Sequence, residues 1–257
     1  MSLATDARGR MYVLDQVNGR VARRGADGSL EATVPIALSG AQDLAVAADG
    51  SLVVLDRLGD KKVSIYDESG TLRGDLSLSG AGADSGLLTG VFVDGTDVYV
   101  EREHGMLSRI GDTSGAAGKP TEVPGRPSRD GAAWLHAGIV DGAAGRAYVS
   151  AVDRATGAHR FTRELRLRAE LRSIVLLDSD RAGTIYFGAE LHEEPGRDWI
   201  AITCLEPRRG QPVGAVVLPV NTLPEETFRD LVVLDGGGVV QALRSESGVS
   251  YQVYECH

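Results

Sequence analysis

DARGRMYVLD at residues 6–15 and AADGSLVVLD at residues 47–56 align without a gap. Each stretch has a glycine, then a short apolar run, then an aspartate. Glycine accepts a positive φ at no steric cost, so each stretch predicts a tight turn followed by a β-strand that ends in an acid. The unit recurs more loosely along the chain, with spacings of 41, 45, 50, 38 and 55 residues between the turn glycines. These are Gly9, Gly50, Gly95, Gly145, Gly183 and Gly238.

The second unit shows the whole pattern most clearly. It contains four apolar runs separated by glycine turns, at residues 44–47, 51–55, 62–66 and 71–78. Four antiparallel strands in roughly 40 to 45 residues is the size of one β-propeller blade. The sequence therefore predicts an all-β fold, a six-bladed β-propeller of four-stranded antiparallel blades, as one domain over residues 1–257. The last blade is expected to be incomplete, or to take its fourth strand from outside this sequence.

The first two units also resemble a known repeat family. After the strand that ends in Asp15 come Asn18, Arg20 and Val21, which is similar to the Asn-x-Arg-Val signature of the NHL repeat. The second unit keeps Asp56 but departs from the signature after it. The resemblance is specific over residues 1–80 and general beyond them. It implies an NHL-like six-bladed propeller, a fold that serves as a scaffold, as a ligand-binding module and, less often, as an enzyme.

Two segments depart from the plain repeat. Residues 161–175 are rich in arginine and glutamate, but residues 165–169 alternate between apolar and polar, which predicts an outer strand. A short surface helix is the alternative. Residues 111–131 are rich in glycine, proline and serine and are expected to form the longest irregular connection.

Composition excludes several classes of protein. The 257 residues are 42% hydrophobic and 25% charged with a net charge of −9, so phosphate backbones should be repelled and nucleic-acid binding is not expected. No apolar run approaches the roughly 18 to 20 residues of a membrane-spanning helix, so membrane insertion is not expected either. The N-terminus lacks the pattern of a signal peptide. If Met1-Ser2-Leu3 replaces an export signal, a periplasmic or extracellular location is favoured; otherwise the protein is expected in the cytoplasm.

The two cysteines, Cys204 and Cys256, each end a similar alternating run. We therefore expect them at equivalent positions of neighbouring blades. Such positions lie farther apart than the roughly 7 Å between Cα atoms that a disulfide tolerates, so two separate thiols are expected, with a disulfide as the alternative.

A partner-binding face can be predicted from the repeat. In a propeller, the loops after each second strand and those before the next first strand lie on one face, around the central channel. The polar and aromatic residues that the repeat places there form the candidate site for a protein or small ligand. They are Asp43, Glu101, His104, Trp134, His136, Arg172, Glu190, His192, Arg229 and Asp230.

Three of these residues, His104, His136 and His192, could instead act as metal ligands or as acid–base groups, with Glu101 or Glu190 as partner. No His-x-x-x-His spacing supports a metal site, and three unrelated loop histidines are the alternative. The acids that end equivalent strands are expected to accept backbone N–H groups of the turns that follow. They are Asp15, Asp56 and Glu101, and an acidic ring for a cation or a basic partner is the alternative.

Sequence motifs of catalysis are mostly absent. The chain has no Gly-x-Ser-x-Gly, no phosphate-binding loop and no Cys-x-x-Cys pair, and residues 236–238 form a glycine turn between strands. We therefore expect a non-enzymatic scaffold with a binding face and no resident cofactor. A propeller lyase or hydrolase that depends on a divalent metal at the histidines is the alternative, and a structural spacer is a third hypothesis.

Overall fold

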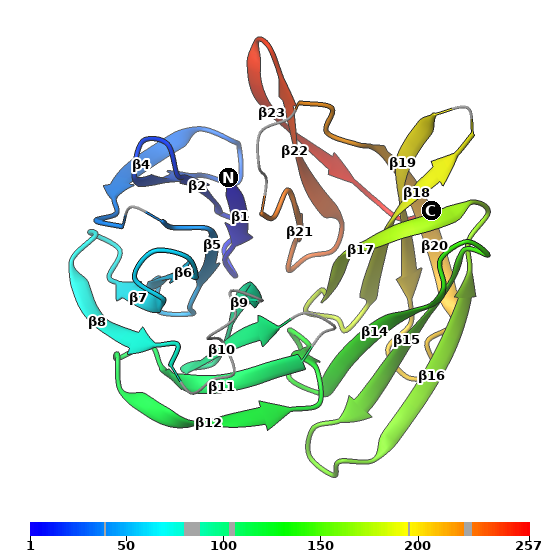
Figure 1. Cartoon of the computed structure of the whole chain (residues 1–257), viewed down its shortest axis with the longest axis horizontal. Coiled ribbons are helices and arrows are strands. Elements are labelled where there is room, and N and C mark those ends of the chain that lie inside the picture. Colours follow the sequence, from blue (N-terminus) through cyan, green and yellow to red (C-terminus); the bar gives the residue numbers. More distant parts are fainter. Residues whose placement is uncertain (39, 80–87, 103–105, 195, 224–227) are drawn as a thin grey trace. The chain divides into compact units, whose positions relative to one another are not determined.

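The fold is entirely β in the computed structural model, which describes all residues except 39, 80–87, 103–105, 195 and 224–227. The strands form six antiparallel sheets, the blades of a six-bladed β-propeller (Figure 1). The predicted fold class is thus confirmed. The described residues contain no helix that is long and apolar enough to cross a membrane.

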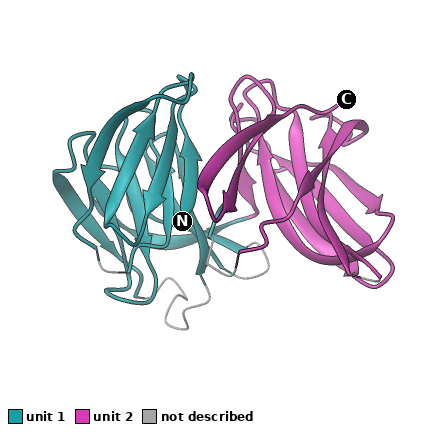
Figure 2. Cartoon of the chain, turned by 90° about the horizontal axis from the view of Figure 1, so that it is seen from above, with its two compact units in different colours: residues 1–123, 226–230 teal, residues 124–225, 231–257 magenta. Residues whose placement is uncertain are grey.

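The sheets fall into two compact units (Figure 2). Unit 1 comprises residues 1–123 and 226–230, and unit 2 comprises residues 124–225 and 231–257. Each unit contains three of the six sheets. The assignment of residues 1–257 to a single domain stays a prediction.

The three sheets of unit 1 each have four strands in chain order. The first has β1 (Ser2–Thr5), β2 (Met11–Asp15), β3 (Arg20–Arg24) and β4 (Leu30–Pro35). The second has β5 (Asp43–Val46), β6 (Leu52–Asp56), β7 (Lys62–Tyr66) and β8 (Leu72–Ser77), close to the predicted bounds. The third has β9 (Leu88–Asp94), β10 (Asp97–Arg102), β11 (Met106–Asp112) and β12 (Ala117–Val123).

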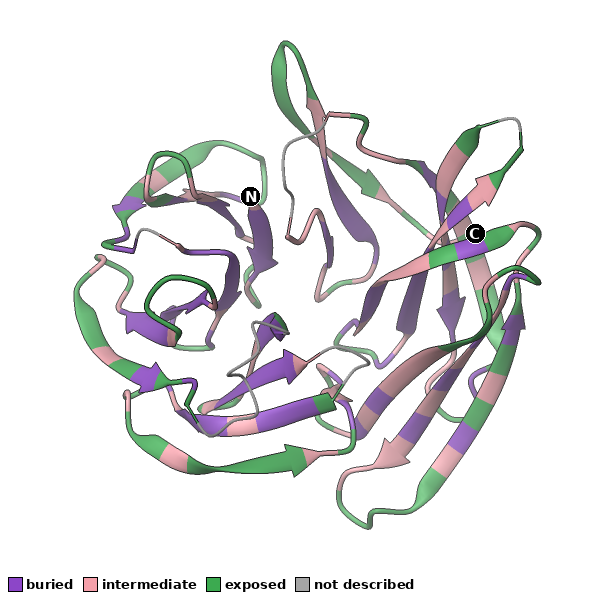
Figure 3. Cartoon of the chain, in the orientation of Figure 1, coloured by how far each residue is buried: buried purple, intermediate pink, exposed green. Residues whose placement is uncertain are grey.

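In each sheet of unit 1, the fourth strand is the most exposed. β1, β2, β5, β6 and β7 are mostly buried, whereas β4, β8 and β12 are mainly exposed (Figure 3). Between the second and third sheets, the side chains of Val53, Val63 and Leu76 pack in one cluster with Val91 and Val98. The sheets of this unit are therefore held face to face by apolar side chains that water does not reach.

Unit 2 also contains three sheets. The fourth sheet has β13 (Arg126–Pro127), β14 (Ala133–Asp141), β15 (Arg146–Asp153) and β16 (His159–Arg166). The fifth has β17 (Glu170–Ser179), β18 (Ile185–Glu193), β19 (Arg197–Leu205) and β20 (Pro212–Pro219). The sixth has only β21 (Leu231–Val233), β22 (Val239–Ser245) and β23 (Gly248–Tyr254), so the expected incomplete last blade is confirmed for the described residues.

All six turn glycines of the predicted repeat have a positive φ, from 59° to 89°. Five of them join the first two strands of a sheet, but Gly145 joins β14 to β15, the second and third strands. The equivalent glycine of the fourth sheet is Gly131, with φ 72°. The predicted register of the fourth unit was therefore wrong, because its first strand, β13, has only two residues and leaves no alternating pattern in the sequence.

The structure shows the secondary structure of the two segments that depart from the repeat, residues 111–131 and 161–175. Residues 111–131 are not one irregular connection, since they contain the seven-residue strand β12 and the short β13. The helix alternative for residues 161–175 is wrong, because this stretch contains the end of β16 and the start of β17.

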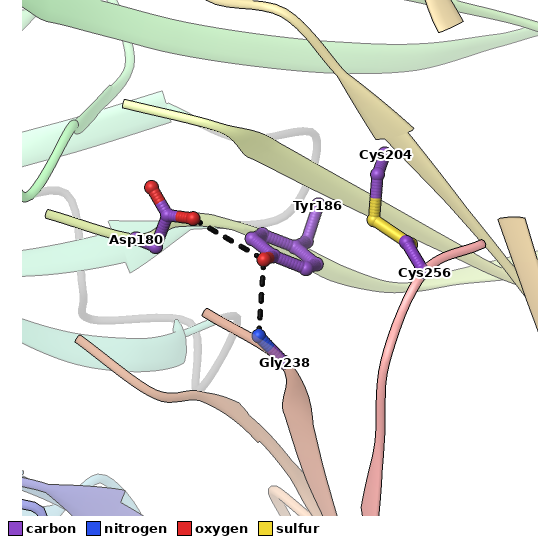
Figure 4. Close-up of a disulfide and its surroundings, with 5 residues drawn as sticks. All are labelled: Asp180, Tyr186, Cys204, Gly238 and Cys256. Atoms are coloured by element: carbon purple, nitrogen blue, oxygen red, sulfur yellow. Dashed lines mark hydrogen bonds between the residues drawn. A yellow bond between two sulfur atoms is a disulfide. The ribbon is translucent and has the colours of Figure 1, made fainter. Parts of the chain in front are cut away.

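Cys204 and Cys256 form a disulfide, with their Cα atoms 6.3 Å apart, so the prediction of two separate thiols was wrong (Figure 4). Cys204 lies in β19, but Cys256 follows the end of β23, where the chain runs beside β20. There the Ala215 amide donates to the His257 carbonyl at 3.1 Å. Gly214 lies opposite Cys204, and a Cβ at Gly214 would be 3.0 Å from that of Cys256. The absence of a side chain at Gly214 thus leaves room for the disulfide.

Removing this disulfide should destabilise the protein, because the bond restrains a long loop of the unfolded chain. For Cys204→Ala with Cys256→Ala we expect a loss of about 2–4 kcal/mol in the free energy of unfolding, measured by urea denaturation. Reductant should lower the stability of the wild type by a similar amount and leave the double variant unchanged. Equal stability of the two proteins without reductant would contradict this assignment.

Candidate functional site

The carboxylate of Asp43, on β5, has no exposed surface and lies at the centre of the candidate site in unit 1. It accepts a hydrogen bond from the Ser2 hydroxyl on β1 at 2.6 Å and one from the Val91 amide on β9 at 2.8 Å. The Arg229 guanidinium donates to its second oxygen at 2.6 Å. One acid therefore connects the first strands of three sheets with residues 228–230.

Arg229 is positioned by several further contacts. Its guanidinium lies over the ring of Phe92, 4.9 Å from the centroid, and its carbonyl accepts the Leu3 amide at 2.9 Å. Gly90 leaves room for this side chain, because a Cβ there would come within 3.3 Å of the guanidinium and 3.4 Å of the Asp43 carboxylate. Two residues that the sequence placed on the candidate face, Asp43 and Arg229, are thus brought together, and Asp230 beside them also interacts within the protein.

Asp15 and Asp56, which end second strands, anchor the turns that follow, as predicted. Asp56 is fully buried and accepts the Gly59 amide at 2.7 Å and the Asp60 amide at 3.2 Å. Asp15 accepts the Asn18 amide at 3.2 Å and the Arg20 guanidinium at 2.8 Å. Burial by itself would raise the pKa of Asp15, but the hydrogen bonds from Asn18 and Arg20 outweigh it and hold that pKa below its usual value.

These anchored turns expose apolar side chains. Val17 follows β2 and is 95% exposed, and Leu58 follows β6 and is 62% exposed. In the third sheet, Met106 begins β11 and is also exposed. Val17 and Leu58 belong to the connection between a second and a third strand, and Met106 is the first residue of a third strand. They are not among the residues of the predicted face, although an apolar residue between Asp15 and Asn18, or between Asp56 and Gly59, is a signal for them in the sequence.

Glu101, also in unit 1, is buried in β10 and not exposed in a loop. Its carboxylate accepts a hydrogen bond from the Thr89 hydroxyl on β9 at 3.0 Å. This position gives it a structural partner inside its own sheet.

The other described candidates belong to unit 2. Trp134 and His136 lie within β14, the second strand of the fourth sheet, so their predicted place before a first strand was wrong for the reason given for Gly145. The Arg154 guanidinium lies 4.4 Å from the centroid of the Trp134 indole. His136 Nδ1 is 3.2 Å from the Tyr148 hydroxyl.

Arg172, Glu190 and His192 lie within strands of the fifth sheet, Arg172 in β17 and the other two in β18, and not in the predicted loops. His192 Nδ1 is 2.6 Å from the Asp198 carboxylate, and the Arg172 guanidinium is 3.7 Å from the same oxygen. Glu190 accepts a hydrogen bond from the Ser173 hydroxyl at 3.2 Å. These long strands therefore hold the three side chains among partners from the same sheet.

No three His, Cys, Asp or Glu side chains converge on a metal position in the described part of the chain. His136 is beside Tyr148 and His192 is beside Asp198, so each has a different partner. His104, the third predicted ligand, lies outside the described residues.

A separate cavity of about 380 Å³ lies beside the disulfide in unit 2. The buried Tyr186 hydroxyl donates to the Asp180 carboxylate at 3.2 Å and accepts the Gly238 amide at 3.0 Å (Figure 4). Burial raises the pKa of Tyr186, with the charge of Asp180 adding to the effect, so the phenol stays protonated. These polar groups satisfy one another, and the residues that the sequence predicted for the site lie elsewhere.

Comparison with known proteins supports the architecture. The hydrazine synthase of Kuenenia stuttgartiensis is similar to this chain with a TM-score of 0.60 and 16% identity, over 97% of this chain and 75% of that one. A streptogramin B lyase is similar with a TM-score of 0.55 and 12% identity, over 98% of this chain and 93% of that one. The dihydro-heme d1 dehydrogenase NirN, in complex with DHE, is similar with a TM-score of 0.52 and 13% identity, over 99% of this chain and 63% of that one. No protein-family model and no curated protein matches the sequence. At these identities the likeness concerns the fold alone.

Breaking the central ion pair should destabilise the fold. Arg229→Met leaves the buried Asp43 carboxylate without its cation and should lower the free energy of unfolding by roughly 3 kcal/mol, measured by urea denaturation. Adding Asp43→Asn should recover part of that loss, because the uncompensated charge is then gone.

The ion pair of Arg102 with Glu122, whose carboxylate is 66% exposed, is the matched control. Arg102→Met should change stability by at most about 1 kcal/mol. Equal effects of Arg102→Met and Arg229→Met would contradict the central role of Asp43.

Proposed function

We propose that this protein is a non-enzymatic propeller scaffold, and that the connections between second and third strands in unit 1 form a face that binds another protein. The observation that carries the proposal is the exposure of Val17 and Leu58 on turns held by buried or half-buried carboxylates. Exposed apolar side chains are common singly, but a recurrence at the same connection of successive sheets indicates a contact surface.

Rigid turns make such a surface effective. Binding loses affinity when loops must be ordered on association, and the hydrogen bonds from Asn18 to Asp15 and from Gly59 to Asp56 order these turns in advance. Charged residues follow both turns in the chain, since Arg20 begins β3 and Lys62 begins β7. An apolar centre with a charged rim is the usual composition of a protein interface.

The charged groups near this face favour binding over catalysis. Asp43 is neutralised by Arg229, and Glu101 is hydrogen-bonded to Thr89. A general acid or base must reach a substrate proton, whereas these carboxylates are buried and occupied by the protein's own donors. With a net charge of −9, the partner we propose is a protein and not a nucleic acid.

We further propose that the blades are of NHL type and that the protein is exported. The hydrogen bonds of Asn18 and Arg20 to Asp15 give a structural reason for the NHL-like signature of the first unit. The disulfide between Cys204 and Cys256 supports export, because disulfides persist in the periplasm and outside cells and are rare in the cytosol.

A photocrosslinking amino acid at position 58 should test the proposed face. In extract from the native host, it should capture a defined protein that the same group at position 213 does not capture. Val213 is the matched control because it is 60% exposed, against 62% for Leu58, and lies on β20 in unit 2.

The captured protein should then be purified and its affinity measured. Val17→Glu with Leu58→Glu should weaken binding at least tenfold, about 1.4 kcal/mol, and Val213→Glu should leave it unchanged. Identical capture from positions 58 and 213, or unchanged affinity of the double variant, would refute the proposed face.

A further inference from the structure

The sixth sheet ends on an open edge. β23 pairs with β22 on one side, and no other described strand pairs with its second side. An open strand edge offers a row of backbone donors and acceptors to any extended chain that approaches. Proteins usually blunt such an edge with charged side chains or proline.

The outermost strands of the other five sheets carry these protective features, and β23 does not. β4, β8, β12 and β16 all contain charged side chains, and β20 begins and ends with proline. β20 is also covered in part by the hydrogen bond from Ala215 to His257. β23 reads GVSYQVY and has neither a charge nor a proline. Its valines and tyrosines favour strand pairing, and no charge or proline opposes it.

The order of residues in β23 is suited to pairing with itself. Val249 and Val253 lie symmetrically about Tyr251, and Ser250 and Gln252 fill the positions between them. In an antiparallel pair of two such strands centred on Tyr251, each Val249 lies opposite a Val253. Ser250 then lies opposite Gln252, with which it can form a hydrogen bond, and the tyrosines face each other. Apolar, polar and aromatic cross-strand pairs thus all match, and no like charges meet.

We propose that β23 pairs with β23 of a second copy of this chain, across a two-fold axis at Tyr251. The two three-stranded sheets would then join into one sheet of six strands. Two-fold contacts of this kind are self-complementary, and the symmetric order of β23 meets that requirement. This interface involves no residue of the proposed binding face and goes beyond the proposed function.

Sedimentation velocity over a wide range of protein concentration tests the proposal. The wild type should form a reversible dimer. Val249→Lys with Val253→Lys places like charges opposite each other twice and should weaken the dimer at least about tenfold. Val249→Glu with Val253→Lys places opposite charges in the same positions and should restore much of the dimer.

Val217→Lys is the control, since Val217 on β20 is as exposed as Val253, at 61%. It should leave the dimer unchanged, and far-UV circular dichroism should show that every variant is folded. A wild type that stays monomeric at all concentrations would overturn the proposal. So would equal dimer affinity of the Lys/Lys and Glu/Lys variants, since a different interface or a different occupant of β23 would not distinguish them.

Discussion

The carboxylate of Asp43 is withdrawn from water and bound by groups from three other segments of unit 1. An unpaired charge in that position would be strongly unfavourable, so the side chain is stable only when Ser2, Val91 and Arg229 are all in place. The first strands of three sheets are thereby tied to one another and to residues that follow β20 in the chain. The apolar clusters between the sheets supply most of the stability, and this acid specifies how the strands meet.

The same device, a carboxylate turned inward on backbone donors, recurs at the ends of second strands. Asp15 and Asp56 order the turns that expose Val17 and Leu58. The binding function proposed for this chain follows from that arrangement, because the turns that carry Val17 and Leu58 are ordered before any partner binds. Glu101 and Glu190, the acids that the sequence suggested as partners of the histidines, accept hydrogen bonds from Thr89 and Ser173 within their own sheets.

Local chemistry explains how far the sequence could predict this protein. The turn glycines and the strands around Gly50 were predictable because a positive φ and an alternating pattern depend on near neighbours. β13 was missed because two residues carry no pattern. The sequence assigned Asp43 and Arg229 to one exposed binding face, but Asp43 is fully buried in an ion pair with Arg229. This pair joins residues 186 apart in sequence, which no local rule supplies. The disulfide was not predicted for a similar reason, because the path of the chain after β23 depends on its contacts with β20.

Hydrogen exchange of the backbone amides tests the central claim most directly, because it reports whether these carboxylates order the chain. The amides of Val91 and Gly59 are bonded to the buried Asp43 and Asp56, respectively. They should exchange as slowly as amides paired within β5 and β6, even though Gly59 lies in a turn. Exchange of Gly59 at the rate of an unstructured loop, or rapid exchange of Val91, would contradict a face that is ordered in advance by buried acids.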